Sequence, residues 1–467
     1  MTEVTVYCLH ALGGSGRSFD ALTARLSRSD PGTRIVPIDL PGFGDAAQTP
    51  GYTVDRMASH VLDRIRRDGA ARWLVLGHSM GGKVASVVAR RALSGADPVF
   101  GLAGVVMLAA SPPVPEPMGE DKRSEMLAWV GDGTLDPADA RTFIDQNVGA
   151  PLPAAADDRA LADLARMNVD AWRHWLTEGS REDLSARVGI LDIPAVVLAG
   201  EDDGDLGADA QPRLHARVYP RARFVRLAGA GHLLPQERPV EVAAAISTLD
   251  AEVGAHSPRV PDEWAMLIAS EEVEPRVRAA LATRALADDP RRAPRALTGP
   301  QLESLRALAT VVVPQPHGGC IDLAARFDAQ LAAGDGDGWR PADLPPEPAA
   351  SALALDALAD DIARDPVATA EALIAGALAP PGSALSAAQL QAWFEDVRVD
   401  LVRHWLAHPA SLARTGNDAF ATRGGERPRG FAVLGEGRRA RWEPEDLGVP
   451  LTVADERRPT GDGEDAA

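Results

Sequence analysis

A serine between glycines links an apolar run to a helix-like stretch near residue 80. The apolar run Trp73 to Leu76 leads into Gly77-His78-Ser79-Met80-Gly81-Gly82, and the stretch Lys83 to Ala89 follows. If a strand turns sharply into a helix here, Gly77 and Gly81 are needed, because a Cβ atom at either position would collide with the turn. The Ser79 hydroxyl would then lie above a helix N-terminus, where backbone N–H groups favour negative charge. The pattern predicts a nucleophile; a flexible Gly/Ser loop is the alternative, because short motifs recur by accident.

A serine nucleophile needs a base, and the base needs an acid that orients it. The apolar run Val196 to Gly200 is followed by Glu201-Asp202-Asp203-Gly204-Asp205, so carboxylates lie on the loop that leaves a predicted buried strand. We choose Asp203 as the acid. Asp202 and Asp205 compete with it, because loop positions inferred from a sequence are uncertain by a few residues.

One histidine follows a predicted strand in the same part of the chain. The alternating run Phe224 to Leu227 leads to the glycine-rich loop Ala228 to Pro235, which carries His232. We choose His232 as the general base, which gives the chain order Ser, Asp, His. The competing histidines lie in helical stretches and follow no strand, namely His60, His174 and His215.

The oxyanion of a tetrahedral intermediate needs backbone N–H donors. A predicted strand, Val4 to Leu9, ends in the loop His10 to Ser15, which can turn an N–H toward the site. We assign Leu12 and Met80 as the donors. Three further polar residues near the site are interpreted as structural: His10 as a loop-shaping hydrogen bonder, His78 as packing under the serine turn, and Asp39 as an acceptor in a Pro-Gly turn.

Residues 1 to about 250 resemble the α/β-hydrolase family. The resemblance rests on four motifs in chain order: His10-Ala11-Leu12-Gly13-Gly14, Asp39-Leu40-Pro41-Gly42-Phe43-Gly44, Gly77-His78-Ser79-Met80-Gly81-Gly82 and Gly231-His232. It implies a doubly wound, mostly parallel sheet, and it favours Asp203 as the residue three after Gly200. The family usually has glycine where this chain has Ala11, so the backbone angles of that loop are expected to differ slightly.

The stretch Gly77 to Lys83 is similar to that of small carboxylesterases in the family. The resemblance therefore implies hydrolysis of carboxylic esters with small to medium acyl or alcohol groups, through a Ser79-His232-Asp203 triad and an acyl-enzyme. The same triad also serves C–C bond and lactone hydrolysis in this fold, so those reactions stay open. No cofactor and no metal are expected.

A proline-punctuated segment of helical pattern lies between the predicted strands Gly104 to Ala110 and Ala195 to Gly200. We interpret it as a lid, at about residues 112–190. Its apolar and aromatic residues are candidates for an acyl or alcohol pocket, although amphipathic helices must bury one face whatever their function. The candidates are Met126, Leu127, Trp129, Val130, Met167, Trp172 and Trp175.

Length and charge bound the remaining possibilities. At 467 residues the chain exceeds one typical core, so two domains are expected. The formal charge of −19 disfavours binding to nucleic acid and to anionic membranes. No apolar run approaches the length that spans a bilayer, and no signal peptide is evident, so a cytoplasmic location is expected. Cys8 and Cys320 lack the spacing of a zinc site or a disulfide framework.

Beyond residue 250 the composition changes. A polar stretch at 251–262 is interpreted as a linker, 263–450 as an all-helical domain, and 451–467 as a disordered tail. Thr298-Gly299-Pro300-Gln301 is typical of a helix cap. Helical periodicity is clear in Arg276 to Leu286, Thr298 to Val313, Leu323 to Leu331, Ala352 to Ile362, Val367 to Leu378 and Ala387 to His408.

Two stretches of this second half resemble the gluconate 2-dehydrogenase subunit 3 family over about residues 260 to 447. They are Leu302 to Pro314, and His408-Pro409 followed by Arg427 to Phe431 and Trp442 to Pro444. The resemblance implies a helical docking subunit without a cofactor of its own, whose partner is a flavin-dependent dehydrogenase of the GMC type. The alternative is a helical domain that only stabilises or dimerises the enzyme.

Overall fold

The computed structural model describes residues 4–131, 133–315, 319–335 and 343–421. Its N-terminal part is built on six strands, paired in parallel in the order β2-β1-β3-β4-β5-β6. The predicted doubly wound parallel sheet is confirmed. One edge strand, β2, was not predicted, because it contains Arg34 and Pro37 and its burial is interrupted. The strands are β1 (Val4–Leu9), β2 (Thr33–Ile38), β3 (Trp73–His78), β4 (Leu102–Leu108), β5 (Ala195–Gly200) and β6 (Ala222–Leu227).

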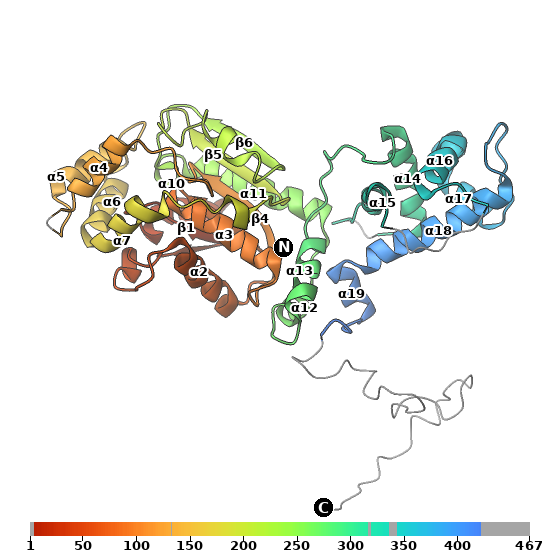
Figure 1. Cartoon of the computed structure of the whole chain (residues 1–467), viewed down its shortest axis with the longest axis horizontal. Helices are drawn as coiled ribbons and strands as arrows, with labels where there is room; N and C mark the ends of the chain where they lie inside the picture. The colour runs from red at the N-terminus through yellow and green to blue at the C-terminus, as the bar shows by residue number, and fades with distance from the viewer. Residues whose placement is uncertain (1–3, 132, 316–318, 336–342, 422–467) are drawn as a thin grey trace, which may run out of the picture.

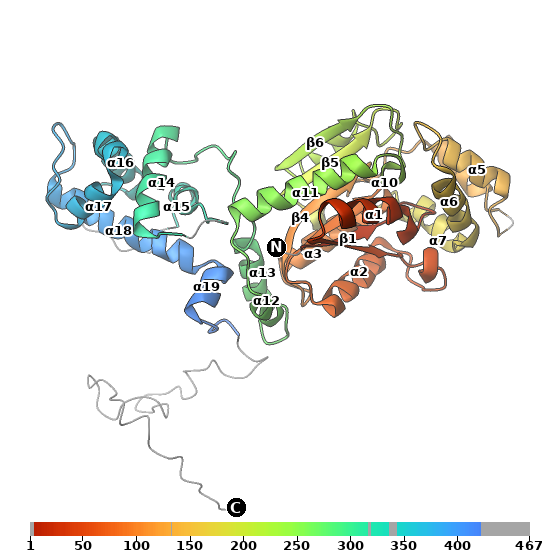
Figure 2. The ribbon, with the colours of Figure 1, turned by 180° about the vertical axis from the view of Figure 1, so that it is seen from behind.

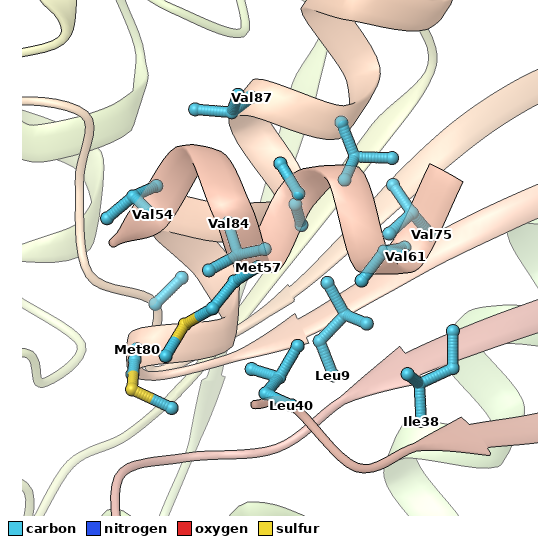
Figure 3. Close-up of a cluster of buried hydrophobic side chains, with 14 of the residues drawn as sticks. Leu9, Ile38, Leu40, Val54, Met57, Val61, Val75, Met80, Val84 and Val87 are labelled. Carbon is cyan, nitrogen blue, oxygen red and sulfur yellow. The ribbon is translucent and has the colours of Figure 1, made fainter. Parts of the chain in front are cut away.

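Helices cover both faces of the sheet, so the central strands are apolar on both sides. In β1, Tyr7 and Leu9 enter one core cluster with helices α2 (Val54–Asp68) and α3 (Met80–Ser94). Val6 and Cys8 enter a second cluster with α1 (Asp20–Ser29) and α11 (Pro239–His256). Part of the first cluster, between α2, α3 and the sheet, is shown in Figure 3.

The strand order places the predicted site. The chain runs from β1 to the edge strand β2 and then returns to β3 on the other side of β1, and the helices that follow β1 and β3 cover opposite faces. In open parallel sheets, ligands bind outside the carboxyl ends of the strands at such a reversal. The loop after β1 and the turn after β3, which carry Leu12 and Ser79, both lie there. Two short helices follow β5 and β6: α9 (Gln211–His215) and α10 (Leu234–Glu237).

The segment predicted to be a lid is helical. It comprises α4 (Glu120–Ala128), α5 (Pro137–Asp145), α6 (Ala154–Arg166), α7 (Val169–His174), a π-helical turn (Trp175–Gly179) and α8 (Ser185–Val188). Figures 1 and 2 show helices α4 to α7 at one end of the molecule, with the C-terminal helices α14 to α18 at the other. Among the described residues, helices α4 to α7 therefore lie far from helices α14 to α18.

The C-terminal region is helical over the residues that the structure describes. Helices α14 to α18 enclose a core of their own, which includes Leu305, Phe327, Leu358, Trp393 and Phe394. The predicted cap is confirmed, because Thr298 and Gln301 exchange hydrogen bonds between side chain and backbone. The bounds are α14 (Gly299–Val312), α15 (Leu323–Ala333), α16 (Glu347–Arg364), α17 (Pro366–Ile374), α18 (Ala387–Leu406) and α19 (Pro409–Thr415).

The predicted linker is partly helical, because α11 continues to His256 and α12 (Asp262–Ile268) begins shortly afterwards. The division of the chain into domains stays a prediction. The predicted disordered tail at 451–467, and the stretches Arg427 to Phe431 and Trp442 to Pro444, lie outside the described residues. Within the described ranges, no helix is both long and apolar enough to cross a membrane.

Helices α12 and α13 (Pro275–Arg284) pack against the N-terminal part rather than against the α14–α18 core. A Cβ atom on Gly95, just after α3, would lie 2.1 Å from the carbonyl oxygen of Pro275. Arg278 of α13 is 3% exposed and donates to the backbone carbonyls of Gly95 and Asp97, as well as to three carbonyls of its own region. One buried guanidinium thus ties α13 to the C-terminal end of α3.

Replacing Arg278 by methionine should lower the free energy of unfolding by about 2–4 kcal/mol, because several buried carbonyls lose a charged donor. Denaturant unfolding of the whole chain measures the effect. Arg276→Met is the matched control, since Arg276 lies exposed on the same helix and should change stability by no more than about 0.5 kcal/mol. Equal unfolding midpoints for the two variants would contradict the role of Arg278.

Candidate active site

Ser79 occupies the sharp turn between β3 and α3. Its backbone has φ 50° and ψ −120°, in a region that residues with a side chain rarely adopt. The amide of Ser79 donates to the carbonyl of Leu108, and the Ser79 carbonyl accepts from the amides of Gly82 and Ser111. These three hydrogen bonds hold a conformation that costs about 1–3 kcal/mol, as is typical of functional sites.

The glycines around Ser79 are required for the reason that the sequence suggested. A Cβ atom on Gly77 would lie 2.5 Å from the carbonyl oxygen of Gly81, and one on Gly81 would lie 2.4 Å from the carbonyl oxygen of Leu9. The role of Gly82 was not predicted. A Cβ atom on Gly82 would lie 2.4 Å from the β-carbon of Ala110. The turn can therefore pack against β1 and the end of β4 only with glycine at these positions.

Among the acids proposed for the loop after β5, Asp203 lies beside His232. Its Oδ2 atom is 2.7 Å from Nδ1 of His232, and both side chains are about nine-tenths buried. Asp202 is exposed, whereas Asp205 lies 3.6 Å from Nζ of Lys122. The structure thus brings Asp203 and His232 together and directs the two competing carboxylates elsewhere.

The Asp203–His232 contact changes the pKa of both groups. Burial disfavours the imidazolium, but the charge of Asp203 and its hydrogen bond outweigh burial, so the pKa of His232 lies above the ordinary 6.5. Burial likewise disfavours the carboxylate, yet the charge of His232 and the hydrogen bond hold the pKa of Asp203 below the ordinary 3.8. The pair is therefore arranged to stabilise a proton on His232.

Two residues outside the predicted site fix the backbone around His232. Nε2 of His78 lies 2.8 Å from the carbonyl oxygen of His232 and must donate, because a carbonyl only accepts. Burial lowers the pKa of His78 to about 3, so its ring is neutral. The Glu237 carboxylate accepts from the amides of Gly149, Gly231 and Leu233. Sequence reasoning missed Glu237; its acidic position five residues after His232 was the available signal.

The amides of Leu12 and Met80, predicted as oxyanion donors, belong to the loop after β1 and to the first residue of α3. Within the described part of the chain, neither amide donates to a protein atom. The Met80 side chain is buried near Met57 and Leu40 in the core (Figure 3), so the side chain does not line the cleft. His10 accepts from the amide of Leu40, which fixes the loop after β1 to the chain that follows β2.

Asp39 is structural, as predicted. Its two carboxylate oxygens accept from the amides of Gly16 and Asp45 at 2.6 and 2.5 Å. His215, expected in a polar helical stretch, is instead fully buried, and its Nε2 atom lies 3.0 Å from the carbonyl oxygen of Ala110. Among the described residues, no cluster of three histidine, cysteine or acidic side chains is arranged to hold a metal ion.

Ser79, Leu12, Asp203 and His232 line one cleft, whose empty space, including its open mouth, measures about 560 Å³. Of the seven lid residues proposed for a pocket, Met126 and Trp175 line this cleft, and the other five pack in or against the core. The remaining lining residues are Ala11, Glu116, Met118, Lys122, Phe143, Asn147, Asp205, Leu206 and Leu233.

Lys83 on α3 anchors the lid over the cleft. Its ammonium group is completely buried and donates to the carbonyls of Gly179 and Glu182 at 3.0 and 2.8 Å. It also lies 5.9 Å from the centre of the Trp175 ring, which forms a wall of the cleft. Burial lowers the pKa of Lys83 to about 8. Helix α3, which follows Ser79, thus also holds Trp175 in the wall of the cleft through Lys83.

Replacing Lys83 by methionine should destabilise the protein by about 2–4 kcal/mol, because it keeps most of the apolar stem but leaves two buried carbonyls without donors. Denaturant unfolding of the full chain measures the loss. Lys122→Met serves as the control, since the Lys122–Asp205 pair is about half exposed and is worth at most about 1 kcal/mol. If both variants unfold at the wild-type midpoint, Lys83 does not anchor the lid.

Residues 6–245, just over half of the chain, match the model of a protein family described as the alpha/beta hydrolase family. A 2-succinyl-6-hydroxy-2,4-cyclohexadiene-1-carboxylate synthase of Serratia proteamaculans (strain 568) is 28% identical over 225 residues, which cover 46% of this chain and 83% of that protein. The sn-1-specific diacylglycerol lipase ABHD11 of Mus musculus is 23% identical over 271 residues, covering 53% of this chain and 81% of the lipase.

A solved structure with a similar backbone is the esterase EaEST from Exiguobacterium antarcticum. It superposes with a TM-score of 0.46 and 18% sequence identity, over 53% of this chain and 92% of the esterase.

Proposed function

The chain belongs to the alpha/beta hydrolase family, and we propose that it is a serine hydrolase that cleaves carboxylic esters with small to medium acyl or alcohol groups. One observation carries the proposal: Ser79 is held in a strained turn and lines the same cleft as the Asp203–His232 pair, whose atoms are 2.7 Å apart. A nucleophile, a base and an acid that orients the base are the parts that such a reaction needs.

In the proposed reaction, His232 takes the proton of the Ser79 hydroxyl as the serine oxygen attacks the ester carbonyl. Asp203 holds the imidazole in place and stabilises the positive charge that forms on it. The amides of Leu12 and Met80 bind the oxyanion of the tetrahedral intermediate, and the N-terminus of α3 adds its dipole. His232 then returns the proton to the leaving alcohol, and water releases the acyl group from Ser79 by the same steps.

Both the cleft and the relatives support esters as substrates. Eight of the fifteen residues that line the cleft are apolar, and these suit an acyl or alcohol group. Among the relatives, one is named a diacylglycerol lipase and another a carboxylate synthase, so members similar to this chain carry more than one reaction. We transfer ester hydrolysis rather than the synthase reaction, because Ser79, His232 and Asp203 would supply the nucleophile, base and orienting acid that an acyl-enzyme needs.

Full-length wild type should hydrolyse p-nitrophenyl esters between acetate and octanoate, and Ser79→Ala and His232→Ala should each lose about a thousandfold or more in kcat/KM. Initial rates across the ester series measure this and also report the acyl length that the cleft prefers. Ser94→Ala, an exposed serine at the far end of the same helix, is the control and should keep wild-type rates.

A fluorophosphonate probe separates the ways in which that assay can fail. Labelling of Ser79 without ester turnover would show a reactive serine and reject the ester assignment, and C–C bond or lactone substrates would then be assayed. Absence of both turnover and labelling would reject the serine hydrolase proposal as a whole.

The pH dependence should report the Asp203–His232 contact. Catalysis needs neutral His232, and Asp203 raises the pKa of His232, so wild-type kcat/KM should rise with pH through an inflection above 6.5. Asp203→Asn removes the stabilising charge, so the inflection should move to lower pH while the plateau falls by about 10⁴. Asp205→Asn is the matched control. An unshifted inflection in Asp203→Asn would show that another group orients His232.

The proposals for the C-terminal helices rest on sequence alone. The resemblance to gluconate 2-dehydrogenase subunit 3 would make this region a docking site for a flavin-dependent dehydrogenase. A cytoplasmic location is proposed with it. Leu302 to Pro314 largely forms α14, whose apolar residues are buried in the α14–α18 core, and His408-Pro409 caps α19. Co-purification of a flavoprotein with the full chain tests the docking proposal.

A further inference from the structure

Glu116 places a carboxylate in the cleft that the proposed mechanism does not use. It lies between β4 and α4 and lines the cleft together with Ser79 and His232. Its amide donates to the carbonyl of Ser180 at 2.7 Å, and its Oε2 atom accepts from the Ser111 hydroxyl at 3.0 Å. The first part of the lid, which carries Glu116, is thus tied to its last part at Ser180, and the Glu116 side chain lines the cleft.

Two cations whose charges act on Glu116, Lys83 and Arg123, donate their hydrogen bonds to other groups. Lys83 donates to the carbonyls of Gly179 and Glu182, and Arg123 donates to the carbonyl of Leu176 and the hydroxyl of Ser180. Neither cation lines the cleft. Among the described residues, no lysine, arginine or histidine nitrogen lies within 4.0 Å of the Glu116 carboxylate. The hydrogen bond from Ser111 therefore leaves this carboxylate with unused acceptor capacity.

The other charged groups of the cleft are paired. Asp203 is bound to His232, and Lys122 and Asp205 face each other at 3.6 Å. Burial raises the pKa of Glu116, although the Ser111 hydrogen bond and the charges of His232, Lys83 and Arg123 oppose the rise. A cationic ligand would offset the cost of burying this carboxylate.

The walls of the cleft suit the same kind of ligand. Trp175 and Phe143 present aromatic rings to it, and Met118 and Met126 add polarisable sulfur. Aromatic faces attract ammonium groups, most strongly where water is excluded. The net charge of −19 over the whole chain also favours the approach of cations.

We propose that the cleft selects esters whose acyl or alcohol part carries an ammonium group, which binds between the Glu116 carboxylate and the aromatic walls. This inference rests on the proposed ester hydrolysis at Ser79 and names its substrate class. Glu116 is a specificity-determining residue in this assignment, and it takes no part in proton transfer.

Matched ester pairs test the assignment. On the acyl side, p-nitrophenyl 4-(trimethylammonio)butanoate is compared with its uncharged isostere, p-nitrophenyl 5,5-dimethylhexanoate. On the alcohol side, acetylcholine is compared with its uncharged isostere, 3,3-dimethylbutyl acetate. Wild type should prefer the charged member of at least one pair by about tenfold or more in kcat/KM, as expected for charge attraction between the trimethylammonium group and the carboxylate together with contact to aromatic faces.

Glu116→Gln should reduce the ratio of kcat/KM between the charged and neutral esters to about twofold or less, and labelling of Ser79 by the fluorophosphonate checks that the variant is folded. Glu125→Gln, the same change at an exposed position on α4, should retain the preference. Equal rates on both members of both pairs in wild type, or a preference that survives Glu116→Gln, would overturn the inference.

Two further measurements keep the result independent of folding and of turnover. In wild type, tetramethylammonium should inhibit hydrolysis of a neutral ester more strongly than 3,3-dimethylbutanol does. If Glu116→Gln does not fold, this comparison decides, and stronger inhibition by 3,3-dimethylbutanol would overturn the inference. If no ester is hydrolysed but the fluorophosphonate labels Ser79, the proposed function fails and the same two compounds are compared as protectants. Protection by the cation alone would still support a cation site, and equal protection would reject it.

Discussion

The close approach of the β3–α3 turn to strand β1 is the constraint on which the rest of the site depends. Gly81 allows this approach, since a Cβ atom there would lie 2.4 Å from the carbonyl oxygen of Leu9. Gly77 allows the turn to close on itself, since a Cβ atom there would lie 2.5 Å from the carbonyl oxygen of Gly81. With the turn pressed against β1, Ser79 and the loop that carries Leu12 open into the same cleft at the reversal of strand order. The absence of Cβ atoms at these glycines thus determines the positions of the predicted nucleophile and of the predicted oxyanion donors.

Helix α3 connects this turn to two other contacts, one with the lid and one with α13. Its first residue follows Ser79, Lys83 one turn later holds the lid, and Gly95 at its end receives α13. Two buried cations lie at these contacts, Lys83 and Arg278. Both donate hydrogen bonds to backbone carbonyls rather than to carboxylates. Such bonds fix the packing of neighbouring segments without forming ion pairs. Because Lys83 binds carbonyls in this way, it forms no salt bridge with the Glu116 carboxylate, and no other residue that the structure describes forms one either.

The sequence was sufficient wherever a local steric or periodic rule acts. Glycine spacing around Ser79, apolar runs that end in glycine, and helical periodicity after residue 298 predicted the turn, the parallel strands and most helices. It was insufficient where tertiary packing decides. Strand β2 carries charged and proline residues and pairs only at the sheet edge, and amphipathic lid helices do not reveal which apolar side chains face the core and which face the cleft.

The same distinction explains the residues that were missed. Glu237 and Glu116 look like ordinary surface acids in the sequence, because their contacts come from residues distant in the chain. Glu237 accepts from the amide of Gly149, and the amide of Glu116 donates to the carbonyl of Ser180. Asp203 differs from them, because the resemblance to the hydrolase family favours the residue three after Gly200, whereas the residues alone left Asp202 and Asp205 as competitors.

The packing of α12 and α13 also bears on how the chain can be divided. The cleft is lined by residues between Ala11 and Leu233, so within the described residues the C-terminal helices contribute nothing to it directly. Yet Phe100 and the surface after Gly95 are covered by helices that come after residue 261. A chain ended at residue 250 would keep every residue of the cleft but expose this apolar surface at the far end of α3. The proposed chemistry therefore belongs to the N-terminal part, whereas the packing that supports it extends beyond the predicted boundary.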